Sequence, residues 1–118
     1  MIWVLVALGG AAGALTRWLV TVILPDHRSG LPIPITLVNI AGSFALGLAV
    51  GLNRADALPV DLLPLTTGAL GGYTTFSTWM VDIDTAEGGV LRTTIAVVPT
   101  VVGVSAAAFG LFLGSSVR

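Results

Sequence analysis

The chain contains no cysteine and no lysine, and only 9% of its 118 residues are charged. Without cysteine, disulfides and thiolate metal sites are excluded. About a quarter of the residues in a soluble domain are charged, so this composition cannot cover the surface of a soluble globule. With 55% hydrophobic residues and a mean hydropathy of +1.00, the chain is predicted to be a membrane protein.

Charges are also missing from four long stretches, which are interrupted by a single arginine. They are Ile2–Leu24, and runs within Leu31–Asn53, Leu62–Val81 and Thr93–Val117. Each has roughly 20 residues or more, enough to cross about 30 Å of hydrocarbon as a helix. The sequence therefore predicts one all-α membrane domain, residues 1–118, with four transmembrane helices. The first is expected to be retained, because it lacks the basic segment and cleavage site of a signal peptide.

No Asp, Glu, His or Lys lies in the interior of a predicted span. A proton-coupled exporter needs an ionisable relay in the membrane, and a membrane hydrolase needs a base or a metal cage. The chain is therefore not expected to be an enzyme. Asp82, Asp84 and Glu87 are expected to form a solvated third loop, and His27 to be a surface residue of the first loop. The net charge of −1 argues against a nucleic-acid partner.

Arginine placement gives almost no bias for membrane orientation. With four spans, Arg54 and Arg118 share one side of the membrane, whereas Arg28 and Arg92 lie on the other, toward which Arg17 also reaches. An excess of basic residues in short loops normally fixes topology. The chain is therefore expected either to insert in both orientations or to have its orientation fixed by a partner chain.

Small residues recur four positions apart in every span. They are Gly9 and Gly13, Ser43 with Gly47 and Gly51, Gly68 and Gly72, and Gly110 and Gly114. Such spacing lets helix backbones approach closely in lipid. Packing among the helices of one chain is the favoured interpretation. Four short helices have little interior, however, so some of these stripes are also expected to contact a second subunit.

Two polar residues within the spans each allow a structural and a functional interpretation. Arg17 lies about 10 Å from the end of its span. It either extends its side chain to the interface or places a fixed positive charge at a pore mouth. Asn39 shares one helix face with Ser43. Its amide either bonds to a neighbouring helix or offers N–H donors to a passing anion.

The segment GGYTTFSTW, residues 71–79, lies in the third span. Consecutive glycines followed by β-branched Thr74 and Thr75 weaken helix propensity. The segment is either a helix that tolerates small residues or a break that releases backbone carbonyls. Released carbonyls must line a cavity, meet a partner or bind a cation. Beyond this point, Phe76 and Trp79 share a helix face, and electropositive aromatic edges favour a small anion.

Three segments together resemble the Fluc (CrcB) family of fluoride channels. They are GGAAGALTRW in the first span, TLVNIAGSFALG in the second and GALGGYTTFSTW in the third. The resemblance implies a four-helix subunit with a broken third helix, which pairs antiparallel with a second subunit. It also implies two fluoride pathways along the dimer interface and a central, structural Na⁺. The backbone carbonyls that hold this ion fall here on Gly71 and Thr74.

The same resemblance implies which residues form the anion pathway. Asn39 matches the pore asparagine of the second helix, and Phe76 matches the first pore phenylalanine. Ser77 and Thr78 match hydroxyls of the polar path, and Arg17 matches the basic residue of the first helix. We expect these side chains to lie along one route through the protein.

The chain departs from the family pattern in two places. The motif usually ends TTFSTF, and this chain has Trp79 at the last position, which is kept as a pathway candidate. The tyrosine and serines that the family's fourth helix usually carries align with Pro99, Gly103 and Ala107, with Thr100 and Ser105 as candidate substitutes. These departures suit a chain in which one pathway is degraded and which pairs with a different subunit.

The function expected from the sequence is passive export of fluoride, which lowers its cytoplasmic concentration. The expected location is the plasma (inner) membrane of a prokaryote, crossed several times. Two alternatives remain. One is a structural partner subunit that holds an active chain in a heterodimer. The other is a small dual-topology drug exporter, which would need a carboxylate inside a span.

Overall fold

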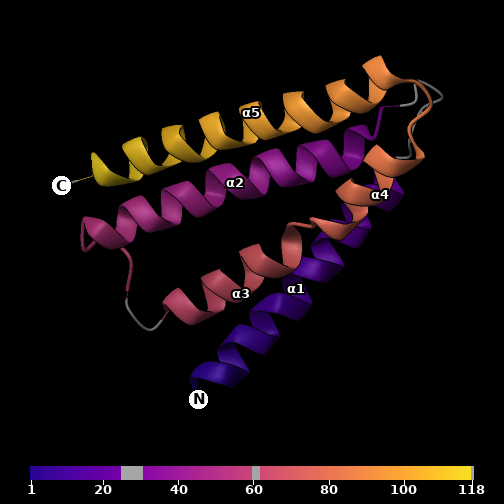
Figure 1. Cartoon of the computed structure of the whole chain (residues 1–118). Coiled ribbons are helices and arrows are strands. Elements are labelled where there is room, and N and C mark those ends of the chain that lie inside the picture. The colour runs from indigo at the N-terminus through magenta and orange to yellow at the C-terminus, as the bar shows by residue number, and fades with distance from the viewer. Residues whose placement is uncertain (25–30, 60–61, 118) are drawn as a thin grey trace.

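The computed structural model describes residues 1–24, 31–59 and 62–117. Within these ranges every regular element is a helix (Figure 1). The helices are α1 (Ile2–Ile23), α2 (Ile33–Arg54), α3 (Leu63–Tyr73), α4 (Ser77–Thr85) and α5 (Gly89–Ser115). The predicted all-α membrane fold is confirmed, since α1, α2 and α5 are each long and apolar enough to cross a membrane.

The helix starts follow from local backbone chemistry. Pro34 lies in the first turn of α2, where its missing N–H leaves no helical bond unmade. Before α5, Gly88 has a φ of 90°, a left-handed conformation that glycine adopts without strain. The first turn of α5 carries exposed Arg92, so this helix begins before the charge-free run that starts at Thr93.

The third predicted span is broken, and α3 and α4 are its two pieces. Helix α3 ends at Tyr73, Thr74 has an extended backbone with a ψ of 153°, and α4 begins at Ser77. With 11 and 9 residues, the pieces are about 16 and 14 Å long, and neither could cross a membrane alone. The glycine pair 71–72 stays helical. Because the helix is interrupted between Tyr73 and Ser77, the alternative of a continuous third helix is wrong.

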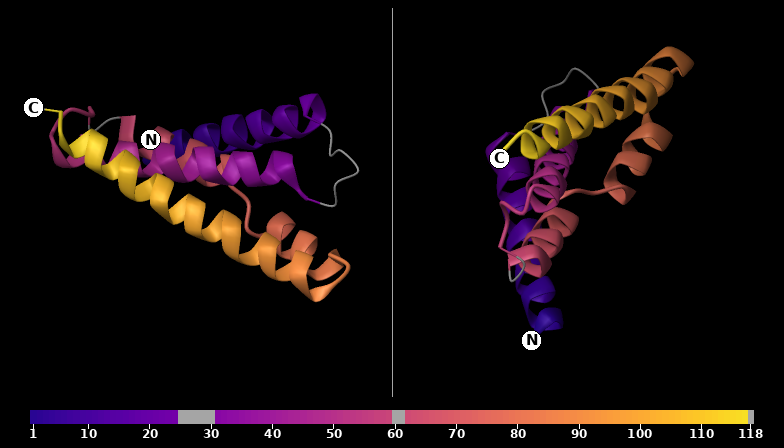
Figure 2. Two further views of the ribbon diagram at one scale, coloured as in Figure 1. Left: turned by 90° about the horizontal axis from the view of Figure 1, so that it is seen from above. Right: turned by 90° about the vertical axis from the view of Figure 1, so that its left-hand side faces the viewer.

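The helices form two closely packed pairs. Helix α2 lies along α5, and α1 crosses α3, whereas the two pairs meet mainly through α2 and α3 (Figure 1). Beyond the break, the chain steps sideways, and α4 lies beside the first turns of α5 (Figure 2). The break therefore carries the chain from one helix pair to the other.

Glycines make both pairs possible. A Cβ added at Gly13 of α1 would strike the backbone carbonyl of Ala69 in α3, and one at Gly110 of α5 would strike that of Phe44 in α2. The same holds for the rest of the predicted stripes, Gly9, Gly47, Gly51, Gly68, Gly72 and Gly114, each of which faces the backbone of a helix in the same chain. Internal packing is confirmed. The expectation that some of these stripes also contact a second subunit stays a prediction.

Large apolar side chains remain on the outside. Among the described residues, Val38 and Ile95 are the only buried members of the hydrophobic core, whereas Trp3, Val90 and Phe112 are largely exposed. The accessible surface is 7590 Å², compared with about 6,000 Å² for a compact soluble monomer of this mass. Exposed apolar surface of this extent is typical of a protein that faces lipid or contacts another protein.

Candidate functional site

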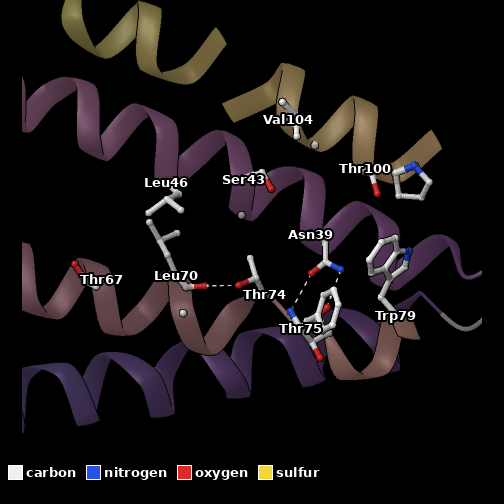
Figure 3. Close-up of a pocket in the computed structure, with 15 residues that line it drawn as sticks. Asn39, Ser43, Leu46, Thr67, Leu70, Thr74, Thr75, Trp79, Thr100 and Val104 are labelled. Carbon is white, nitrogen blue, oxygen red and sulfur yellow. Dashed lines mark hydrogen bonds between the residues drawn. The ribbon is translucent and has the colours of Figure 1, made fainter. Parts of the chain in front are cut away.

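An open groove of about 510 Å³ lies between the two helix pairs, beside the break (Figure 3). Its polar lining comes from Asn39, Ser43, Thr67, Thr74, Thr75 and Thr100, and its aromatic lining from Phe76 and Trp79. The remaining walls are apolar or glycine, including Leu46, Leu70, Gly71 and Val104. Three of the six predicted pathway residues, Asn39, Phe76 and Trp79, therefore line one groove, whereas Arg17, Ser77 and Thr78 are not part of its lining.

Asn39 holds the break in place. Its side-chain oxygen accepts a hydrogen bond from the backbone N–H of Thr75, and its Nδ2 donates to the carbonyl of the same residue, each at 2.9 Å (Figure 3). One amide thus satisfies both backbone groups of Thr75. Of the two interpretations of Asn39, a bond to a neighbouring helical segment is confirmed. One Nδ2 hydrogen remains beyond this pair.

The bond to Asn39 releases the carbonyl of Gly71. In a continuous helix this carbonyl would accept from the N–H of Thr75, four residues later, but that N–H donates to Asn39 instead. The preceding carbonyl, that of Leu70, has two hydrogen-bond donors, because it accepts from both the N–H and the hydroxyl of Thr74. The break therefore leaves a carbonyl on the groove side of α3, at a residue with open space around it.

Thr75 organises the start of α4, a role that the sequence analysis did not assign. Its buried hydroxyl donates to the hydroxyl of Thr78 at 3.1 Å and accepts from the Thr78 N–H at 3.4 Å. The Ser77 hydroxyl lies 3.5 Å away. A threonine three residues before a helical N–H is a typical capping pattern, and the TTFST spacing carries that signal.

Arg17 reaches from α1 into the break. Its guanidinium Nη1 donates to the carbonyl of Thr74 at 3.2 Å, and the side chain is half-buried. Thr74 caps the C-terminal end of α3, where a positive charge stabilises the helix dipole. The interpretation in which Arg17 extends away to the interface is therefore wrong. The positive charge of Arg17 lies beside the break, and its role at a pore mouth stays a prediction.

Phe76 and Trp79 meet edge to face. Their ring centroids are 5.6 Å apart with an interplanar angle of 61°. Phe76 is 70% exposed, whereas Trp79 is half-buried and donates its indole N–H to the Ile95 carbonyl at 3.0 Å. The Phe76 ring is thus free on one side and supported by an anchored ring on the other.

Some of the α5 positions at which the chain departs from the family pattern line the groove, and others do not. Pro99, Thr100 and Gly103 line the groove, whereas exposed Ser105 is not part of its lining. The Thr100 hydroxyl already donates to the Ala96 carbonyl at 2.7 Å. Ala107 packs against Gly47 of α2. Thr100 is therefore the one candidate substitute that the structure brings to the site.

The acidic cluster lies apart from the groove. Asp84 and Glu87 are exposed, but Asp82 and Asp84 belong to the last turns of α4, so the expected loop begins later than predicted. Arg92 of α5 donates to the carbonyl of Asp84 at 3.1 Å. His27 lies outside the described residues. Within those residues, no His, Cys, Asp and Glu side chains gather as a metal site would require.

Comparison with known proteins identifies relatives over nearly the whole chain. The family model described as "CrcB-like protein, Camphor Resistance (CrcB)" matches residues 4–114. The chain is 36% identical to "Fluoride-specific ion channel FluC" of Deinococcus radiodurans, over 97% of this chain and 95% of that one. It is 41% identical to "Fluoride-specific ion channel FluC 1" of Symbiobacterium thermophilum, over 97% and 98% of the two chains.

Replacing Asn39 tests its role at the break. Asn39→Ala leaves the N–H and carbonyl of Thr75 without their partner, at about 1–3 kcal/mol for each unpaired group. We expect a clearly lower unfolding temperature in detergent, measured by circular dichroism. Ser43→Ala, one turn along the same face, is the control and should change stability by at most about 0.5 kcal/mol. Equal stability of the two variants would contradict this role.

Proposed function

This chain belongs to the CrcB family and is a multi-pass membrane protein of a prokaryote, and from that premise we propose that it is a subunit of a fluoride channel. Its task would be passive export of fluoride, which lowers the cytoplasmic concentration of the ion. The family match over residues 4–114, with relatives named as fluoride-specific channels, is the observation that carries the proposal. The function is transport, without enzymatic turnover.

The chemistry of the groove supports an anion pathway. Fluoride is small and strongly hydrated, so a pathway must replace its water with hydrogen-bond donors. The donors proposed here are the remaining Nδ2 hydrogen of Asn39 in the groove and the hydroxyls of Ser77 and Thr78, which lie beside Thr75 and outside the groove lining. Arg17 adds a positive charge beside the break without closing the groove, since its guanidinium is bonded to Thr74.

Aromatic ring edges would stabilise fluoride in the part of the pathway where hydrogen-bond donors are few. The exposed Phe76 ring presents a positive edge, and its T-shaped contact with Trp79 sets its tilt. A bare anion is stabilised by such edges in a water-poor passage, where electrostatic interactions are stronger than in water. Phe76 and Trp79 are therefore proposed to line the narrow part of the route.

A structural Na⁺ at the break is compatible with the donors present. The Gly71 carbonyl has lost its helical donor to Asn39, and the Thr74 carbonyl accepts one bond from Arg17, so a lone pair remains on it. Carbonyl oxygens without carboxylates suit a monovalent cation better than a divalent one. One chain supplies two such oxygens, and a four-oxygen shell requires a second copy.

An antiparallel dimer is proposed for the same reason. The groove is open, large apolar side chains are exposed, and the arginines do not favour one orientation. Two copies related by a two-fold axis in the membrane plane would bring two breaks together. The partner is either a second copy or a similar subunit. A purely structural subunit of a heterodimer is the second candidate, supported by Trp79 and Pro99 in the groove.

The flux prediction concerns Asn39 and Phe76. Liposomes that contain this chain alone should release fluoride, as followed with a fluoride electrode. Asn39→Asp replaces N–H donors with a repelling carboxylate, and Phe76→Ile removes the positive ring edge while retaining bulk. Each should lower the efflux rate by about tenfold or more, which corresponds to about 1.4 kcal/mol in the barrier.

Matched substitutions outside the groove serve as controls. Asn53→Asp makes the same change near the end of α2, and Phe112→Ile makes it at a ring that is 67% exposed, close to the 70% of Phe76. Both should retain wild-type efflux at equal reconstitution. Wild-type rates in Asn39→Asp and Phe76→Ile would refute the proposed pathway. Efflux only after addition of a second, similar subunit would favour the heterodimer.

The assembly prediction joins the dimer to the ion. Replacing Na⁺ with N-methylglucamine should reduce the dimer fraction in detergent and lower its unfolding temperature, because the released carbonyls would face one another without a cation. Size-exclusion chromatography with light scattering measures the first effect. Labelling of terminal tags in intact cells should find them on both membrane faces. A parallel dimer, or one indifferent to Na⁺, would contradict the corresponding part of this proposal.

A further inference from the structure

Pro99 leaves a carbonyl without its helical donor in α5. This proline lies inside the helix, which runs from Gly89 to Ser115. A proline has no N–H, so the carbonyl four residues earlier, that of Ile95, loses its i to i+4 bond. Ile95 is only 2% exposed, so solvent has little access to this site. Such a group must find another donor within the protein, particularly in a membrane.

Trp79 supplies that donor from another helix. Its indole Nε1 donates to the Ile95 carbonyl at 3.0 Å and so ties α4 to α5. Indole N–H is a donor only, and a phenylalanine at this position would provide none. The hydrogen bond therefore depends on a tryptophan at residue 79, and the need for it depends on a proline at residue 99.

We propose that Trp79 and Pro99 are a matched pair that positions the aromatic residues of the groove, with Trp79 acting through its anchored ring and not as an anion donor. This inference rests on the proposed function only where it refers to flux. The two departures, Trp79 and Pro99, are then one linked change, because Pro99 removes the donor of the Ile95 carbonyl and Trp79 provides another donor to it. They are not independent signs of a degraded pathway.

The anchored indole has a direct consequence for Phe76. The two rings are in edge contact at 5.6 Å, and Phe76 is otherwise 70% exposed, so Trp79 is its main support among the described side chains. Fixing the Trp79 ring against α5 thus fixes the orientation of the Phe76 edge. Because the indole N–H already has an acceptor, an anion that passes the groove meets ring edges at this point and no free N–H donor.

A double-mutant cycle tests the pair. Trp79→Phe removes the donor and should lower both the unfolding temperature and the efflux rate, the latter by about tenfold. Pro99→Ala restores an N–H at residue 99, so the Ile95 carbonyl regains its helical bond and the helix keeps its stability. In the Pro99→Ala background, Trp79→Phe should therefore lower the unfolding temperature much less than it does in the parent chain.

Trp18→Phe is the matched control, since this α1 side chain is 61% exposed and lies outside the groove lining. It should lower neither stability nor efflux. Hydrogen exchange of the indole N–H groups, followed by NMR, adds a direct readout. Trp79 should exchange slowly in the parent chain and faster in Pro99→Ala, where its acceptor is shared.

The thermal cycle decides the pairing even if the chain does not conduct fluoride. The proposal would be overturned if Trp79→Phe lowered the unfolding temperature equally in both backgrounds. It would also be overturned if Trp79→Phe did not lower the unfolding temperature of the parent chain. If Trp79→Phe fails to fold in the parent chain, recovery of a folded protein in the Pro99→Ala background supports the pairing, and failure there overturns it. Absence of efflux from the wild type would count against the proposed function alone.

Discussion

The structure depends on one constraint, that backbone groups released inside a membrane must find partners. Breaking the third span releases the N–H and carbonyl of Thr75, and Asn39 binds both. Arg17 donates to the carbonyl of Thr74. The chain can therefore turn from one helix pair to the other at a depth where an unpaired turn would be too costly. The groove that results is mainly apolar with a few polar groups, and none of its lining residues carries a carboxylate.

Glycine packing has a complementary role. The stripes bring α1 against α3 and α2 against α5 so closely that a methyl group would meet backbone atoms. These two pairs pack backbone against backbone, and few large side chains are buried in the described chain. Space remains between the pairs, where α2 and the break meet, and this is where the groove forms. The same glycines face backbone within the chain, whereas large apolar side chains remain exposed.

The sequence analysis was most accurate where one local property sufficed. Charge-free length predicted the spans. For the third span, the residues alone left a continuous helix and a break both open, and the family resemblance implied the break. It was less accurate for individual side chains. Arg17 had two possible directions, because its long side chain can reach either the interface or a neighbouring helix. The hydrogen bonds of Thr75 and Trp79 were not predicted, because their partners lie elsewhere in the chain or beyond the break.

The sequence by itself thus determined the class of protein, its charge-free spans and the residues that resemble a family motif, and that resemblance implied the break in the third span. Hydrophobic length and helix propensity are properties of short segments, and they can be evaluated without a fold. Only the tertiary structure decided that Asn39 bonds to Thr75, that Arg17 bonds to Thr74, and that Trp79 bonds to Ile95. These bonds join a helix to the break or to another helix, and hydrogen bonds of about 3 Å depend on how these segments pack.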